Sequence, residues 1–164
     1  MSIINIVGAK IWGGGEQYVY DICKQLQQRH RAAYTLVDQS NEEMQSRYAQ
    51  VGHVMTANLY TLKGFLSVNA VAKQMKAQGI NTIVCHSGKY ILFCIALKQL
   101  TGAKLMFIKH NLVPGKIDMY HKWINSQVDA FVCVSKLVYD DLMTPIIKNT
   151  SNCLLYTSPS PRDV

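Results

Sequence analysis

The chain has 164 residues, of which 49 % are hydrophobic and 16 % are charged, so it is long and apolar enough to bury one sizeable core. Its longest apolar run, residues 90–97, is far shorter than the roughly 20 residues that a membrane-spanning helix needs, and its first residues read as a strand and not as a signal peptide. The formal net charge of +7 favours an anionic partner, and the composition as a whole predicts one cytoplasmic domain.

Short apolar runs and amphipathic segments alternate along the chain. Buried strands are predicted at residues 2–7, 33–38, 53–57, 81–86, 104–110 and 130–135. Helices are predicted between them: one with an apolar stripe from Tyr18 to Leu26, and others at about residues 42–50, 66–78, 89–100, 116–127 and 136–143. Strands separated by helices form βαβ units, so the predicted fold class is α/β, a parallel sheet with helices on both faces.

Five cysteines are scattered along the chain without a CxxC pair: Cys23, Cys85, Cys94, Cys133 and Cys153. The first four lie in apolar periodic segments, where a thiol serves as a small hydrophobic side chain. We expect these cysteines to be reduced core residues. We expect no metal site, because no ligand spacing typical of zinc is present.

Residues 153–163, CLLYTSPSPRD, differ in composition from everything before them. Back-translated, they resemble the read-through of a transposon-based sequencing adapter; a natural disordered tail rich in proline and serine is the alternative. We therefore expect a domain at residues 1–152 that is incomplete at its end, followed by a disordered, adapter-derived segment at residues 153–164.

Polar residues follow several of the predicted strands. In a parallel α/β sheet, ligands bind beyond the carboxyl ends of the strands, so we expect these residues to meet along one edge. They are Gly13, Gly14 and Gly15 after the first strand, Asp38 after the second, His86 and Ser87 after the fourth, His110 and Asn111 after the fifth, and Ser135 after the sixth.

Three consecutive glycines stand between the first strand and the first helix. Backbone amides at a helix N-terminus attract anions, and without Cβ atoms a phosphate can come close; a tight turn without a ligand is the alternative. Gly14 and Gly15 stand where a Walker A loop needs lysine and serine or threonine, which argues against that loop. A dinucleotide-binding GxGxxG pattern fails at Tyr18, although Asp38 is well placed to hold a ribose. That alternative stays open.

His86 and His110 each end a predicted buried strand, so both imidazoles are expected at the edge that carries the glycines. There an imidazole can hydrogen-bond a sugar hydroxyl or a phosphate oxygen, or transfer a proton; for each histidine taken singly, a structural role is the alternative. Ser135 is expected first to cap the last helix and second to contact a ligand.

Nine lysine and arginine residues and no acidic residue lie between Met44 and Ile117. Such a field attracts an anionic membrane surface, a lipid phosphate, an acidic glycan or nucleic acid. Nucleic acid is disfavoured, because the basic residues do not alternate with aromatic ones. One basic amphipathic stretch fits contact with anionic lipid, with a solvated helix face as the alternative: Lys63, Lys73 and Lys76 with Phe65, Leu66, Val68 and Val71.

Four segments together resemble the amino-terminal domain of family 4 glycosyltransferases of the GT-B type: GGGEQYVYDICKQL, VCHSG, FIKHN and DAFVCVSKLVYDDL, in this order and separation. The resemblance implies a Rossmann-like domain, one of two that face each other across a cleft. It implies that Gly13, Gly14 and Gly15 approach the diphosphate of a nucleotide-sugar donor and that His110 is a catalytic residue beside the transferred sugar. The cleft near the acceptor or the leaving phosphate would be lined by His86, Ser87, Asn111 and Ser135.

The family transfers sugars with retention of configuration and without a required metal, so the resemblance implies no cofactor; the nucleotide-diphosphate sugar is a substrate. The family's two donor-binding glutamates, in its second domain, have no counterpart here, and we expect this fragment to be inactive alone. The predicted function is the acceptor-side domain of a hexosyltransferase that builds an envelope polysaccharide or lipid-linked glycan, cytoplasmic or peripheral on the inner face of the membrane. The alternatives are a nicotinamide-dinucleotide-binding oxidoreductase domain and a non-catalytic module that binds sugar or membrane.

Overall fold

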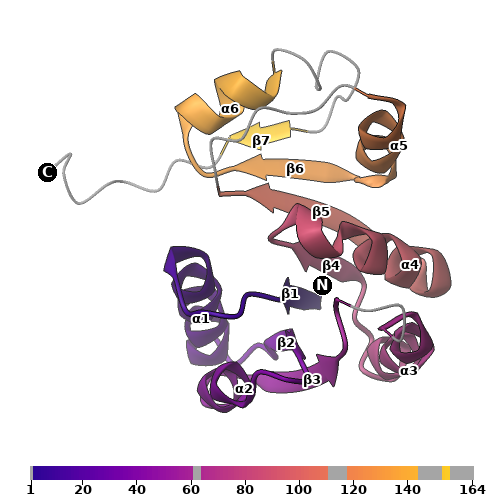
Figure 1. Ribbon diagram of the computed structural model, residues 1–164. Helices are drawn as coiled ribbons and strands as arrows, with labels where there is room; N and C mark the ends of the chain where they lie inside the picture. Colours follow the sequence, from indigo (N-terminus) through magenta and orange to yellow (C-terminus); the bar gives the residue numbers. More distant parts are fainter. Residues whose placement is uncertain (1, 61–63, 111–117, 144–152, 156–164) are drawn as a thin grey trace, which may run out of the picture.

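The structure of the protein is a computed structural model, which describes residues 2–60, 64–110, 118–143 and 153–155. Within these ranges, seven strands form one sheet in the order β3-β2-β1-β4-β5-β6-β7, and every neighbouring pair is parallel (Figure 1). The strands are β1 (Ile3–Val7), β2 (Tyr34–Asp38), β3 (His53–Ala57), β4 (Thr82–Cys85), β5 (Lys104–Lys109), β6 (Ala130–Cys133) and β7 (Cys153–Leu155).

The helices connect successive strands, as the parallel pairing requires. They are α1 (Gly14–Gln28), α2 (Glu42–Ala49), α3 (Gly64–Ala77), α4 (Ile91–Thr101), α5 (Met119–Gln127) and α6 (Lys136–Met143), and a 3-10 turn, η1 (Gly88–Tyr90), precedes α4. Figure 1 shows α1 and α2 on one side of the sheet and α3 and α4 on the other. The predicted α/β class with helices on both faces is confirmed.

Side-chain caps account for where several helices begin. The carboxylate of Asp118 accepts from the His121 N–H at 2.9 Å, so α5 begins at Met119, three residues later than predicted. The Asn41 side chain accepts from the Met44 N–H at 3.1 Å at the start of α2. The helix predicted from residue 89 opens instead as the 3-10 turn η1, and α4 ends at Gly102, whose φ of 72° is the left-handed conformation that favours glycine.

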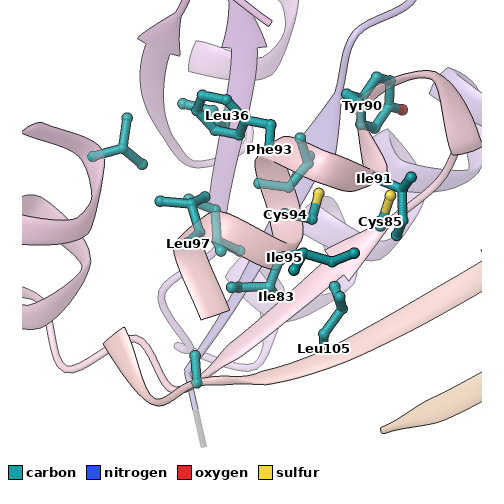
Figure 2. Packing of buried hydrophobic residues seen from close by; sticks show 14 of the residues in the cluster. Leu36, Ile83, Cys85, Tyr90, Ile91, Phe93, Cys94, Ile95, Leu97 and Leu105 are labelled. Atoms are coloured by element: carbon teal, nitrogen blue, oxygen red, sulfur yellow. The ribbon is translucent and has the colours of Figure 1, made fainter. Parts of the chain in front are cut away.

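Among the described residues, buried hydrophobic side chains form three clusters: a large one on one face of the sheet and two on the other face, of which one consists of Val84, Ile108 and Val132. Figure 2 shows the large cluster, where the α4 side chains Phe93, Cys94 and Leu97 pack with Ile83 and Leu105 from the central strands. The remaining cluster, on the same face as Val84, lies under α1 and α2 and combines residues of these helices with residues of β1, β2 and the adjoining loops. Its members are Val7, Val19, Cys23, Ala33, Val37, Met44, Tyr48 and Val51. Because successive side chains of a strand point to opposite faces, a residue's position in its strand decides on which face it packs.

The cysteines of the described core match their prediction. Cys23, Cys85, Cys94 and Cys133 are buried and form no disulfide. Burial raises the pKa of the Cys23 and Cys94 thiols, so both stay protonated and uncharged at neutral pH.

Residues 153–164 were predicted to be disordered, but the structure has a strand at Cys153–Leu155. These three apolar residues form β7, with Cys153 opposite Phe131 and Leu155 opposite Cys133 on β6. The physical reason is that the far edge of β6 offers unpaired backbone groups, which a short extended apolar segment can satisfy. The remaining tail, residues 156–164, lies outside the described residues, and the adapter origin of the segment stays a prediction.

The prediction of an amphipathic membrane-contacting face on α3 is changed by the packing. Val68 and Val71 are each 2 % exposed and belong to the large cluster, so the apolar stripe of α3 faces the sheet. Lys73 and Lys76 are exposed, as is Leu66 near the start of the helix. Lys63 and the side chain of Phe65 lie outside the described residues.

Candidate functional site

A cleft of about 1080 Å³ opens at the carboxyl ends of the central strands. It is lined by residues 9–11 after β1, by Gly15 and Glu16 in the first turn of α1, by Tyr60, by residues 86–90 after β4, and by residues 107–110 at the end of β5. These segments are far apart in the sequence and meet because β1, β4 and β5 are neighbours in the sheet. This is the edge at which α/β sheets bind ligands.

Gly8 allows the chain to leave β1 close to the wall of the cleft. A Cβ atom at this position would lie 2.7 Å from two ring carbons of Tyr90 and 2.9 Å from the hydroxyl oxygen of Tyr60. Both tyrosines line the cleft, and Tyr90 is buried, so its ring has little freedom to move away. Glycine is therefore required here by close approach.

The three glycines differ in what surrounds them. Gly13 is the N-cap of α1, and its N–H donates to Oε2 of Glu16 at 3.0 Å, so a carboxylate of the chain already occupies part of the helix N-terminus. A Cβ at Gly14 or Gly15 would meet nothing within 4 Å. Only Gly15 of the three is among the described residues that line the cleft. The bare backbone at Gly14 and Gly15 thus borders open space, as close approach of a ligand requires.

His86 and His110 lie in direct contact, which the sequence did not predict. Nδ1 of His86 is 3.0 Å from Nε2 of His110, and Nε2 of His86 is 3.1 Å from Oδ1 of Asn5. The Tyr18 ring from α1 packs roughly perpendicular to both imidazoles, with ring centroids 5.5 Å from His110 and 6.4 Å from His86. The buried Asn5 was missed; its signal is a lone amide inside the apolar strand IINIV.

Both imidazoles are uncharged at neutral pH. Burial, with a smaller contribution from the neighbouring His110, lowers the pKa of His86 to about 3. Burial also lowers the pKa of His110, and the nearby Glu16 carboxylate opposes this shift without cancelling it. The pair therefore adds no positive charge to the cleft.

The positive charge of the cleft comes from lysines. Lys10, Lys89 and Lys109 line it, and Glu16 is the one acidic side chain among the lining residues that the structure describes. Lys89 and Lys109 belong to the stretch without acidic residues, so part of that basic field faces the cleft. Together with the N-terminus of α1, these lysines favour a ligand that carries negative charge.

Of the other predicted site residues, only Ser87 is among the described residues that line the cleft. The Ser87 hydroxyl also accepts from the Lys89 N–H at 3.3 Å at the start of η1. Ser135 caps α6, since its hydroxyl accepts from the Val138 N–H at 3.2 Å, and it is not among the described lining residues. Asn111 lies outside the described residues.

Asp38 does not point to a ligand. Its carboxylate is buried and accepts from the backbone N–H groups of Ser40 at 3.0 Å and Leu59 at 2.9 Å. Burial alone would raise the pKa of Asp38, but a hydrogen bond from the Ser40 hydroxyl at 2.5 Å, these two backbone hydrogen bonds and the charge of Lys10 together outweigh burial and hold the pKa below its ordinary value. The position of Asp38 at the end of β2, which supported a dinucleotide ribose there, is therefore explained by hydrogen bonds within the protein.

Among the residues that the structure describes, no group of three or more histidine, cysteine, aspartate or glutamate side chains is arranged to hold a metal ion. Within the same ranges, no helix is both long enough and apolar enough to cross a bilayer.

The fold and the cleft define an α/β domain with an open cleft at the carboxyl edge of a parallel sheet. The structure is similar to a glycosyltransferase from Rickettsia africae, with a TM-score of 0.75 and 17 % identity over 95 % of this chain and 42 % of that one. It is also similar to Anabaena HepE, solved with UDP and glucose, with a TM-score of 0.70 and 15 % identity over 99 % of this chain and 48 % of that one.

A third similar structure is the lipopolysaccharide outer core galactosyltransferase WaaB, with a TM-score of 0.66 and 13 % identity over 98 % of this chain and 46 % of that one. At these identities the likeness shows a shared fold. This chain spans less than half the length of each of the three proteins. No protein of curated function is significantly similar to it in sequence.

The family model for Glycosyltransferase Family 4 matches residues 12–148, which is most of the chain. The chain therefore belongs to glycosyltransferase family 4, and the family predicted from its motifs is confirmed. The match includes the glycines that begin α1 and both histidines of the cleft.

Proposed function

We propose that this chain is the acceptor-side domain of a retaining glycosyltransferase that transfers a sugar from a nucleotide-diphosphate sugar to a glycan or lipid-linked acceptor. The observation that carries the proposal is the cleft, where the start of α1 at Gly15, three lysines and His110 border one space. The first two favour anionic groups, and an uncharged imidazole suits the hydroxyls of a sugar. A nucleotide-diphosphate sugar has both kinds of group in one molecule.

The donor class has support from the similar structures. Anabaena HepE was solved with UDP and with UDP-glucose. In the proposed arrangement, Gly13, Gly14 and Gly15 lie near the donor diphosphate, with Gly15 nearest the cleft, and His110 is the catalytic residue beside the transferred sugar. His86, Ser87, Asn111 and Ser135 remain proposed acceptor-side residues.

The acceptor is proposed to carry negative charge or to lie at a negatively charged surface. Lys10, Lys89 and Lys109 outnumber the single lining carboxylate, so more positive charge faces the cleft than the start of α1 alone provides. A lipid-linked phosphate or an acidic glycan fits this excess. The exposed Lys73 and Lys76 of α3 support peripheral contact with anionic lipid on the cytoplasmic side. No cofactor is part of the proposal.

Substitution of Gly15 tests the proposal in the full-length enzyme. Gly15→Val fills space that borders the cleft without meeting any protein atom within 4 Å of its Cβ, so the fold should be kept while the approach of a diphosphate is blocked. We expect UDP binding, measured by calorimetry, to weaken at least about tenfold, which corresponds to about 1.4 kcal/mol. Sugar transfer from UDP-glucose, or from whichever donor the enzyme accepts, should fall with it.

Ala49→Val is the matched control. Ala49 is exposed at the end of α2, so the added methyl groups lie on the surface away from the cleft. This variant should bind and turn over like the unmodified enzyme. Unchanged binding and transfer by Gly15→Val would rule out the proposed position of the diphosphate.

A further inference from the structure

Asn5, His86 and His110 come from three neighbouring strands and share one face of the sheet. Asn5 is in the middle of β1, His86 directly follows β4, and His110 directly follows β5. The alternation of side chains places Val84 with His86 and Ile108 with His110, on the face where Tyr18 packs. The contacts between the three side chains therefore follow from strand order and register.

The first contact determines where the proton of His86 lies. Oδ1 of Asn5 is only an acceptor, so Nε2 of His86, 3.1 Å away, must carry the hydrogen. The amide nitrogen of Asn5 points to Sγ of Cys23, 4.0 Å away. His86 is uncharged, because burial holds its pKa at about 3, so it has a single N–H and its Nδ1 is an acceptor.

The second contact passes this constraint to His110. Nε2 of His110 lies 3.0 Å from Nδ1 of His86, and two unprotonated nitrogens would repel each other at that distance. Nε2 of His110 therefore carries the hydrogen. In the uncharged ring, Nδ1 is then unprotonated, and no described residue makes a hydrogen bond to it, although the ring lines the cleft. The charged side chains that line the cleft together with His110 are Lys10, Glu16, Lys89 and Lys109.

We propose that Asn5 and His86 are positioning residues that hold His110 as its Nε2–H tautomer, with Nδ1 as the acceptor for a ligand hydroxyl. An unprotonated nitrogen accepts a hydrogen bond from a hydroxyl and repels a phosphate oxygen. The anionic part of a ligand then belongs to the lysines and the start of α1, and the hydroxyl-bearing part belongs to His110. That the ligand hydroxyl belongs to a sugar rests on the proposed function, whereas the tautomer of His110 follows from the contacts with His86 and Asn5 alone.

Nitrogen NMR of the full-length protein tests the tautomer directly. The protein is labelled with ¹⁵N-histidine, and the His110 signals are assigned by their loss in His110→Gln. Long-range proton–nitrogen correlations distinguish a protonated ring nitrogen from an unprotonated one. At neutral pH we expect His110 to show a protonated Nε2 and an unprotonated Nδ1. A proton on Nδ1, or on both nitrogens, would overturn the proposal without the need for any variant.

Two variants test whether Asn5 is the cause. Asn5→Leu keeps the approximate volume but removes the acceptor for His86, so both rings are free to exchange tautomers and His110 should no longer give the signals of one form. Thr35→Val is the matched control: it removes a buried polar group that contacts the same Cys23 thiol, at 3.5 Å, and leaves the two histidine contacts intact. If Asn5→Leu does not fold, His86→Phe removes the acceptor for His110 and leads to the same expectation.

Activity separates this inference from the proposed function. With sugar transfer as the readout, Asn5→Leu should lower kcat/KM by about tenfold or more, and Thr35→Val should leave it unchanged. Unchanged His110 signals in Asn5→Leu would show that Asn5 positions nothing. A protein with the expected tautomer and no sugar transfer would contradict the proposed function and leave the positioning by Asn5 and His86 supported.

Discussion

His86 is uncharged in the folded protein, and this makes stability depend on pH. Its pKa is about 3 in the fold and 6.5 in an exposed histidine, so between these values the unfolded chain binds a proton that the folded chain does not. The contribution of neutral His86 to stability is therefore complete above pH 6.5 and is lost as the pH falls towards 3. From pH 7 to pH 5 we expect this residue to lower the free energy of unfolding by about 2 kcal/mol.

Urea unfolding at pH 7 and pH 5 measures this loss, with His86→Gln as the comparison. The pKa values of Asp38 and Asp129 lie below the ordinary value of 3.8, so both carboxylates stay ionised over this interval and contribute little to the difference. The variant should lose about 2 kcal/mol less than the unmodified protein. Equal losses in the two proteins would mean that His86 is protonated in the fold.

At the level of single residues, the sequence identified which groups lie near the site, but it did not identify the contacts between them. His86 and His110 were predicted at the carboxyl edge because each follows a short apolar run, and the end of such a run can be recognised in the sequence. Asn5 was not predicted, since its importance depends on the neighbours of β1 in the sheet, and strand order is a long-range property. The sequence indicated that Asp38 could hold a ribose. Its carboxylate instead accepts hydrogen bonds from Ser40 and Leu59, and these contacts depend on loop conformations that the sequence pattern does not predict.

At the level of elements, Lys98 and Asp129 join α4 to the second half of the sheet. Nζ of Lys98, on α4, lies 2.8 Å from Oδ2 of Asp129 and donates to the Gln127 carbonyl at 2.7 Å. The same Oδ2 accepts from the Leu105 N–H on β5 at 2.7 Å. Lys98→Met keeps the apolar stem and removes the charge, so we expect a loss of about 1–2 kcal/mol in the free energy of unfolding.

Glu43→Gln is the control for this substitution. It breaks an exposed ion pair between Glu43 and Arg47 on one helix, and exposed pairs of this kind contribute about 0.5 kcal/mol or less. Denaturant unfolding of both variants gives the comparison. A loss in Lys98→Met no larger than in Glu43→Gln would mean that the contact between α4, β5 and β6 adds nothing to stability.

Helices and strands with a clear hydrophobic period were found where the sequence predicted them, within a few residues. The exceptions have local causes: Asp118 delays the start of α5 by capping it, and η1 tightens the backbone before α4. The strand β7 was missed because only three residues pair, and pairing depends on the free edge of β6. A composition unlike the rest of the chain is no evidence against such pairing.

At the level of the whole molecule, exposed apolar side chains gather at the carboxyl edge of the sheet. Ile11, Leu66 and Leu137 are 82, 80 and 63 % exposed. Each lies in the first turn of a helix or in the loop before it, and helices that follow parallel strands begin at that edge. This is also the edge of the cleft. Apolar surface concentrated beside a binding cleft is typical of a face that another part of a protein covers.

The solved structures of similar fold are about twice as long as this chain, which leaves room for such a part. The chain spans 42–48 % of the three solved proteins, so a protein of their size has room for a second domain facing the cleft. The family resemblance implies a second domain that carries a pair of donor-binding glutamates, and we expect the reading frame to continue past codon 152 into that domain. The measurement is to amplify the locus and sequence it past that codon with a library prepared without transposon adapters. A natural frame that encodes residues 153–164 and then stops would contradict this expectation, and the cleft would then belong to a binding module that receives its ligand without a second domain.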